Sequence, residues 1–119
     1  MKKITAILLA ICMLLSMMIG PVSVEAATPN VENAISWAKV TANGISHGYS
    51  WDGRWGPDYD CASFVYTAYR NAGFKIGTSG STTYSMVKDF TAYGEFEWIT
   101  NINFANANQL KRGDILLNQ

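Results

Sequence analysis

The chain has 119 residues, a length that allows one small domain. Its 9 basic and 9 acidic side chains give a formal net charge of zero at pH 7, without the basic stripe or patch that a nucleic-acid-binding protein needs. Aromatic residues make up 13% of the chain, and this density of packing material favours a folded domain over a disordered tail.

The N-terminal segment has the layout of a secretory signal peptide. Lys2 and Lys3 form a short basic head, residues 4–20 are almost entirely apolar, and small residues precede a cleavage site after Ala26. The alternative is an uncleaved anchor helix, because about 17 apolar residues are the lower limit for spanning a bilayer. The cleavage-site pattern favours the signal peptide.

We therefore divide the chain into a signal peptide, residues 1–26, and an exported domain, residues 27–119. The exported protein is expected to be secreted and associated with the cell wall, without stable membrane association. Cys61 is then its single cysteine, so no internal disulfide can form.

The exported domain is expected to begin with a helix that ends at Asn43. Thr28 is a typical N-cap, and Pro29 fits the first turn. The apolar residues that follow recur at helical spacing up to Ala42. Residues 45–59 then form a long aromatic loop, and loops of this length are often functional.

Two further helices follow, each with apolar residues at helical spacing. Asp60 is a typical N-cap for a helix over residues 61–71, and Gly73 is the type of residue that ends one. The next helix is predicted over residues 82–93, with Gly94 as its stop.

The last part of the sequence predicts short strands. Residues 96–99 are aromatic and β-branched, and residues 115–117 are apolar after a polar turn. We therefore expect an α+β fold, in which helices are followed by the start of an antiparallel sheet. An apolar strand needs neighbours to pair with. Because the sequence stops two residues after the second strand, we expect a domain that is truncated at its C-terminal end.

Cys61 is the candidate nucleophile, because it is predicted to open a helix directly after a glycine-rich loop. Unpaired N–H groups and the positive dipole end of a helix favour the thiolate, which is the reactive form. The same N–H groups can hold an oxyanion beside it. The charge of Asp60 opposes the thiolate, unless capping the helix uses that charge. The alternative is that Cys61 is a small buried apolar residue.

The residues around Cys61 resemble a known family. The segment 59–65 (YDCASFV) resembles the nucleophile helix of the NlpC-type papain-like cell-wall peptidases. Segments 46–49 (SHGY) and 54–59 (RWGPDY) resemble the branch of bacteriophage peptidoglycan hydrolases or amidases. Segment 110–117 (LKRGDILL) resembles the turn and first core strand of that family. The resemblance covers nearly all of the exported domain.

The resemblance implies the nucleophile-bearing half of a papain-like domain, with peptidoglycan as the partner. It implies that Cys61 hydrolyses an amide bond through a thioester, either inside the stem peptide or at the muramoyl-L-alanine link. The family's base is a histidine that starts the strand after the Gly-Asp strand, and the sequence ends before that position. We therefore expect little activity from this chain alone. A catalytically dead wall-binding module and a non-functional truncated remnant are the alternatives.

The loop before Cys61 holds the candidate substrate residues. Tyr49 resembles the family tyrosine that lies near the nucleophile and helps to bind the substrate or the oxyanion. His47 is the chain's only histidine, and a substrate contact fits it better than the missing base. Trp51 and Trp55 line a groove for wall peptide or glycan, or else pin the loop to the domain. No metal and no cofactor is expected, because no set of ligands has suitable spacing.

Overall fold

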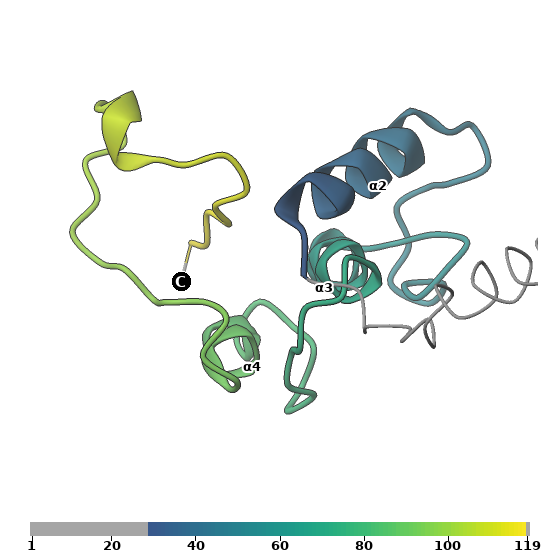
Figure 1. Cartoon of the computed structure of the whole chain (residues 1–119). Coiled ribbons are helices and arrows are strands. Elements are labelled where there is room, and N and C mark those ends of the chain that lie inside the picture. The colour runs from purple at the N-terminus through teal and green to yellow at the C-terminus, as the bar shows by residue number, and fades with distance from the viewer. Residues whose placement is uncertain (1–28, 119) are drawn as a thin grey trace, which may run out of the picture.

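The structure, a computed structural model, describes residues 29–118. In chain order it contains the helices α2 (Val31–Asn43), α3 (Cys61–Asn71) and α4 (Met86–Thr91) and the short 3-10 helix η1 (Ala107–Gln109). Helices α2 and α3 pack against each other, and the chain after α4 makes a wide excursion through η1 (Figure 1). None of the helices in the described part is long and apolar enough to cross a membrane. The predicted signal peptide lies outside the described residues.

Helix α2 ends at Asn43, as predicted, but its cap differs from the prediction. Asn30 is the N-cap, and its side-chain oxygen accepts a hydrogen bond of 2.8 Å from the N–H of Glu32. Pro29 therefore lies before the helix instead of in its first turn. Thr28, the predicted cap, lies outside the described residues. Asn and Thr both serve as caps, so the sequence alone did not distinguish them.

Helix α3 has the predicted bounds and the predicted cap. The side chain of Asp60 accepts from the N–H of Ser63, and the side chain of Ser63 accepts from the N–H of Asp60. This reciprocal capping box fixes the first turn of the helix. At the other end Ala72 is the C-cap and Gly73 follows with φ 92°, a conformation that glycine adopts without steric cost. The N–H of Gly73 then donates to the carbonyl of Arg70, which ends the helix.

The core is aromatic and centres on α3. Tyr66 is fully buried, and its ring meets the ring of Phe90 from α4 at 5.1 Å between centroids. Tyr69, one turn further along α3, meets Phe74 at 5.3 Å and Phe96 at 5.2 Å. These rings meet edge to face, the arrangement that aromatic pairs prefer. The cluster fixes α3 against α4.

Helix α4 is shorter than the predicted helix over residues 82–93. It begins at Met86, because the hydroxyl of Ser85 accepts from the N–H of Thr82 and closes a turn there. A serine side chain that bonds to nearby backbone competes with helix formation in this way. The helix also ends earlier than predicted, at Thr91 with Ala92 as its C-cap, and Gly94 follows with φ 74°.

A buried carboxylate organises the loop between α3 and α4. Asp89 is 1% exposed and accepts from the hydroxyl and the N–H of Ser79 at 2.6 and 2.7 Å. It also accepts from the hydroxyl of Tyr66 at 2.6 Å. Burial alone would raise the pKa of Asp89, but these hydrogen bonds hold it well below its usual range. Burial and the bond to Asp89 raise the pKa of Tyr66 to about 12.

The predicted strands and sheet are wrong for the described part of the chain. Residues 96–99 and 115–117 have extended or irregular backbone without ladder pairing, and the whole range 29–118 contains no strand. Its one β-type contact is an isolated bridge between Tyr49 and Tyr59. The two segments instead line one open pocket of about 660 Å³. A strand is stable only through its neighbours, and the α+β papain-like sheet is therefore not formed here.

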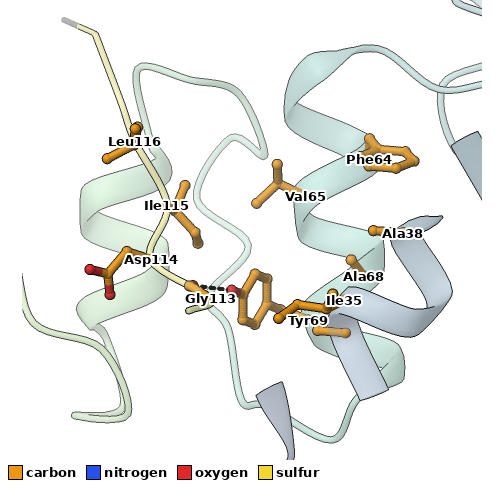
Figure 2. A pocket seen from close by; sticks show the side chains of 11 residues that line it. Ile35, Ala38, Phe64, Val65, Ala68, Tyr69, Gly113, Asp114, Ile115 and Leu116 are labelled. Atoms are coloured by element: carbon orange, nitrogen blue, oxygen red, sulfur yellow. Dashed lines mark hydrogen bonds between the residues drawn. The ribbon is translucent and has the colours of Figure 1, made fainter. Parts of the chain in front are cut away.

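The end of the described chain returns to the helices. The hydroxyl of Tyr69 donates to the carbonyl of Gly113, and Figure 2 shows this bond beside the α3 side chains. Arg112 forms a 2.6 Å ion pair with Glu32 of α2. Between residues 113–116 and the two helices lies an open, mostly apolar pocket of about 360 Å³. The docking of this segment is therefore local and incomplete.

Candidate active site

Cys61 is the first residue of α3, and its side chain is exposed. The next two residues, Ala62 and Ser63, are buried at 2% and 0% exposure. The helix therefore presents the thiol to solvent while its first turn is fixed in the core. This placement excludes the alternative reading of Cys61 as a small buried apolar residue.

The start of α3 carries unpaired backbone amides. The capping box uses the N–H groups of Asp60 and Ser63, in bonds of 2.9 and 2.7 Å. The N–H groups of Cys61 and Ala62 have no hydrogen-bond partner within residues 29–118. Unpaired amides at a helix N-terminus favour an anion nearby. The thiol and two potential oxyanion donors thus belong to the same helical turn.

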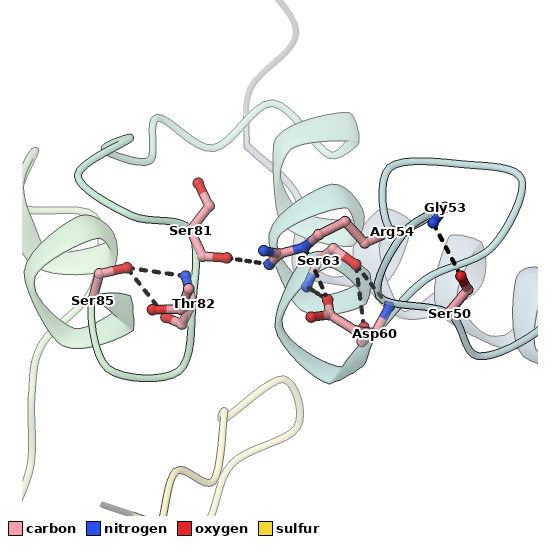
Figure 3. A network of polar contacts seen from close by, with 8 residues as sticks. All are labelled: Ser50, Gly53, Arg54, Asp60, Ser63, Ser81, Thr82 and Ser85. Carbon is pink, nitrogen blue, oxygen red and sulfur yellow. Dashed lines mark hydrogen bonds and ion pairs between the residues drawn. The ribbon is translucent and has the colours of Figure 1, made fainter.

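Arg54 lies beside the cap of this helix, and sequence reasoning missed it. Its guanidinium Nε is 3.4 Å from the Oδ1 atom of Asp60, and the two side chains are 12% and 5% exposed. The same guanidinium donates to the carbonyl of Ser81 (Figure 3). The sequence signal was an arginine between two tryptophans, Trp51 and Trp55, six residues before an acidic cap.

The long loop folds back onto the residues that precede the thiol. The N–H of Tyr59 donates to the carbonyl of Gly48 at 3.0 Å, and the N–H of Ser50 donates to the carbonyl of Tyr59 at 3.1 Å. Asp58 adds a side-chain bond of 2.8 Å from the N–H of Gly48. Tyr59 also packs edge-on against Trp37 of α2. These contacts hold Tyr49 in an isolated β-bridge to Tyr59, which lies two positions before Cys61.

The predicted substrate residues of the loop are exposed. Tyr49, Trp51 and Trp55 expose 78%, 61% and 50% of their surface. The two tryptophan rings also face the Arg54 guanidinium, at 4.3 and 5.0 Å from their centroids. These contacts tie the loop to Arg54, while a substrate contact by either tryptophan stays a prediction. Neither of the two pockets described above is lined by Cys61.

His47 is exposed, and its ring is oriented by the loop. Its Nδ1 atom lies 2.6 Å from the carbonyl oxygen of Pro57. Because a carbonyl only accepts, Nδ1 carries the proton, and Nε2 is the basic nitrogen of the neutral ring. Within the described residues, no group of three or more His, Cys, Asp or Glu side chains is placed to hold a metal ion.

Comparison with known proteins places this chain in a family. A protein-family model described as bacteriophage peptidoglycan hydrolase, an amidase family, matches residues 30–119. The chain belongs to this family. The match includes the loop before Cys61, all of α3 and the segment that returns to Tyr69, so the predicted family is confirmed at this level. Family membership identifies peptidoglycan as the substrate of this hydrolase. Neither the curated proteins nor the solved structures gave a significant match.

Proposed function

We propose that this hydrolase cleaves an amide bond of peptidoglycan with Cys61 as the nucleophile. The sulfur attacks the carbonyl carbon, the carbon–nitrogen bond breaks, and the amine leaves with the proton that the thiol gave up. Water then hydrolyses the thioester, which releases the carboxylic acid and restores the thiol. The bond is either inside the stem peptide or between muramic acid and L-alanine, as in the NlpC-type enzymes and amidases that the motifs resemble.

One observation carries the proposal: the exposed thiol shares the first turn of a capped helix with the amides of Cys61 and Ala62, which have no partner among residues 29–118. When a carbonyl carbon bonds to the sulfur, its oxygen becomes an anion beside that sulfur. Donors that are already oriented stabilise such an oxyanion without reorganisation. The capping box fixes their orientation, because Asp60 and Ser63 are both buried.

The loop residues are the proposed substrate contacts. Trp51 and Trp55 offer exposed rings, and aromatic rings of this kind stack on sugars or on peptide groups. Tyr49 contributes an exposed hydroxyl on the strand-like segment bridged to Tyr59. His47 contributes the lone pair of Nε2, since Nδ1 is bound to Pro57. These four residues would orient the wall peptide or glycan over Cys61.

The supply of a general base limits the expected activity. His47 is the only histidine in the sequence, and its ring is hydrogen-bonded to Pro57 of the loop, without a bond to Cys61. A thiol without a base of its own has no efficient way to protonate the leaving amine. We therefore expect slow hydrolysis by the 119-residue chain. The same observation supports a second candidate, a wall-binding module that keeps the exposed aromatic surface but does not turn over.

We further propose that the protein acts outside the cell, because residues 1–26 have the signal-peptide pattern. Sequencing the N-terminus of protein recovered from the culture medium tests this part. An N-terminus at Ala27 supports export with cleavage. Full-length chain that stays with the cells contradicts it.

The experiment on function measures dye release from covalently labelled peptidoglycan by the full chain. Cys61→Ala should reduce release to background, because the nucleophile is lost. Cys12→Ala, the matched change at the chain's other cysteine, should leave release unchanged. Equal release by the wild type and Cys61→Ala would overturn the proposal. Sedimentation of the wild type with peptidoglycan, without any dye release, would favour the wall-binding candidate.

A further inference from the structure

We propose that Arg54 is a positioning residue that acts on the nucleophile through the cap residue Asp60. This inference rests on the proposed role of Cys61. Asp60 is needed to cap α3, but its negative charge lies next to the thiol in sequence and disfavours the thiolate. The Arg54 guanidinium offsets that charge while leaving the capping bonds intact.

The burial of the pair supports this role. The Asp60 side chain is 5% exposed and that of Arg54 is 12% exposed, so solvent screens their interaction weakly. Of the cations within residues 29–118, Arg54 is the one in an ion pair with Asp60. Its Nε lies 3.4 Å from Oδ1 without forming a hydrogen bond. The contact is therefore mainly one of charge, while Ser63 supplies the hydrogen bond to the same oxygen.

The guanidinium is held in this position from three sides. Trp51 and Trp55 place their rings against it, at 4.3 and 5.0 Å from the ring centroids. On a third side it donates to the carbonyl of Ser81. The N–H of Ser81 lies 3.4 Å from the buried carboxylate of Asp89. Figure 3 shows Arg54 reaching from its own loop to both Asp60 and Ser81.

Arg54 therefore joins two loops at the N-terminus of α3. One is the aromatic loop over residues 45–59, which carries the proposed substrate contacts. The other is the loop over residues 77–85, which is anchored to α4 through Asp89. A lysine could supply the charge at this point. It could not reproduce the planar stacking against two indoles together with the bond to a carbonyl.

The test measures how fast Cys61 reacts with iodoacetamide, a neutral reagent, at pH 7 in the full chain. Tryptic digestion separates the two cysteines, because Cys61 lies in the peptide 55–70, or 40–70 where Arg54 is replaced by glutamine, and Cys12 lies before Lys39. Arg54→Gln should slow alkylation of Cys61 by roughly fivefold, since the residue next to the thiolate then carries an uncompensated carboxylate. In an Asp60→Asn background, which keeps a capping side chain without the charge, Arg54→Gln should change the rate by less than about twofold.

Two further variants separate charge from scaffolding. Arg54→Lys should recover part of the lost rate, because it restores the charge. Arg112→Gln, which removes an arginine from an exposed ion pair elsewhere, should leave the rate unchanged. Far-UV circular dichroism identifies any variant that has lost α3.

Two results would overturn the proposal: an unchanged rate in Arg54→Gln, or an equal slowing with and without the Asp60 charge. The second result would assign Arg54 a purely structural role. Failure of the proposed function is detected by a different measurement, in which Cys61→Ala releases as much dye as the wild type. The alkylation rates do not depend on that outcome.

Discussion

The helical region, residues 29–94, and the tail, residues 95–118, are stabilised by different means. Every buried side chain of the described chain lies between Ala34 and Phe90. The tail contributes half-buried side chains, such as Phe96 and Ile115, that pack around this core from outside. In the tail, Gly113 also accepts a hydrogen bond from Tyr69, and Arg112 forms an ion pair with Glu32. The candidate active site lies in the helical region, and its geometry should therefore depend little on how firmly the tail docks.

The largest expected effect comes from the centre of the helical region. Asp89→Ala leaves the hydroxyls of Tyr66 and Ser79 and the N–H of Ser79 without their acceptor in a buried site. We expect a loss of about 3–4 kcal/mol in the free energy of unfolding, measured by urea denaturation at pH 7. Asp52→Ala, at an exposed aspartate, should stay within about 0.5 kcal/mol of the wild type.

The same carboxylate predicts that the free energy of unfolding depends on pH in the acid range. Its pKa is lowered in the folded state, so its contribution to stability is present above the unfolded value of about 3.9 and is lost as pH falls below it. The stability difference between wild type and Asp89→Ala should therefore shrink as the pH is lowered from 5 to 3. A difference that stays constant over this range would show that the charge of Asp89 does not stabilise the fold.

Phe96→Ala tests the firmest contact between the two regions. Phe96 is half-buried, and its ring meets those of Phe90, Tyr69 and Phe74 at 4.9–5.2 Å. Full truncation of a buried phenylalanine costs about 3–5 kcal/mol, so we expect about 2 kcal/mol here. Phe104→Ala, at a tail residue that is 68% exposed, is the matched control and should have no measurable effect. Equal losses in both variants would mean that the tail is as tightly packed as the helices.

Gly113→Ala should loosen the tail without unfolding the helices. Gly113 has φ 96°, and a Cβ placed there collides with the side chain of Val31. We expect a local cost of about 1–2 kcal/mol. It should appear as trypsin cleavage after Arg112 that is about five- to tenfold faster, with an unchanged urea midpoint for the helices. A lowered urea midpoint would show that the two regions unfold together.

The smallest effect is expected at the ion pair between Glu32 and Arg112. Both side chains are more than half exposed, at 59% and 58%, and solvent and salt screen such pairs. The hydrogen bond from Arg112 lowers the pKa of Glu32, yet in this exposed setting it adds little stability. Glu32→Gln should leave the urea midpoint unchanged within error in 150 mM salt. A clear drop in that midpoint would assign the tail a larger role than the comparison gives it.

The two regions also differ in how far sequence predicts them. The bounds of α3 and the cap at Asp60 follow from residues close together in the chain, so local patterns were sufficient. The strands at residues 96–99 and 115–117 required pairing partners, and strand propensity does not reveal whether such partners lie alongside. The predicted α+β sheet was wrong for this reason.

The candidate site also contains features that the local sequence predicts and features that it does not. Cys61 and its exposure at a helix start were accessible from the sequence, because cap and thiol are adjacent residues. Arg54 was not, since its carbonyl partner Ser81 is 27 positions away and joins it only through the fold of two loops. Likewise, the bond between His47 and Pro57 depends on the path of the loop, which no local pattern predicts.

The central claim, a covalent role for Cys61, is tested most directly by looking for the acyl intermediate. The full chain is incubated with soluble peptidoglycan fragments and quenched with acid, and the tryptic peptide 55–70 is analysed by mass spectrometry. The account predicts an added mass equal to the acyl part of the cleaved fragment, removable by hydroxylamine and absent in Cys61→Ala. Hydrolysis of the fragments that proceeds with no such adduct, and at an equal rate in Cys61→Ala, would contradict it.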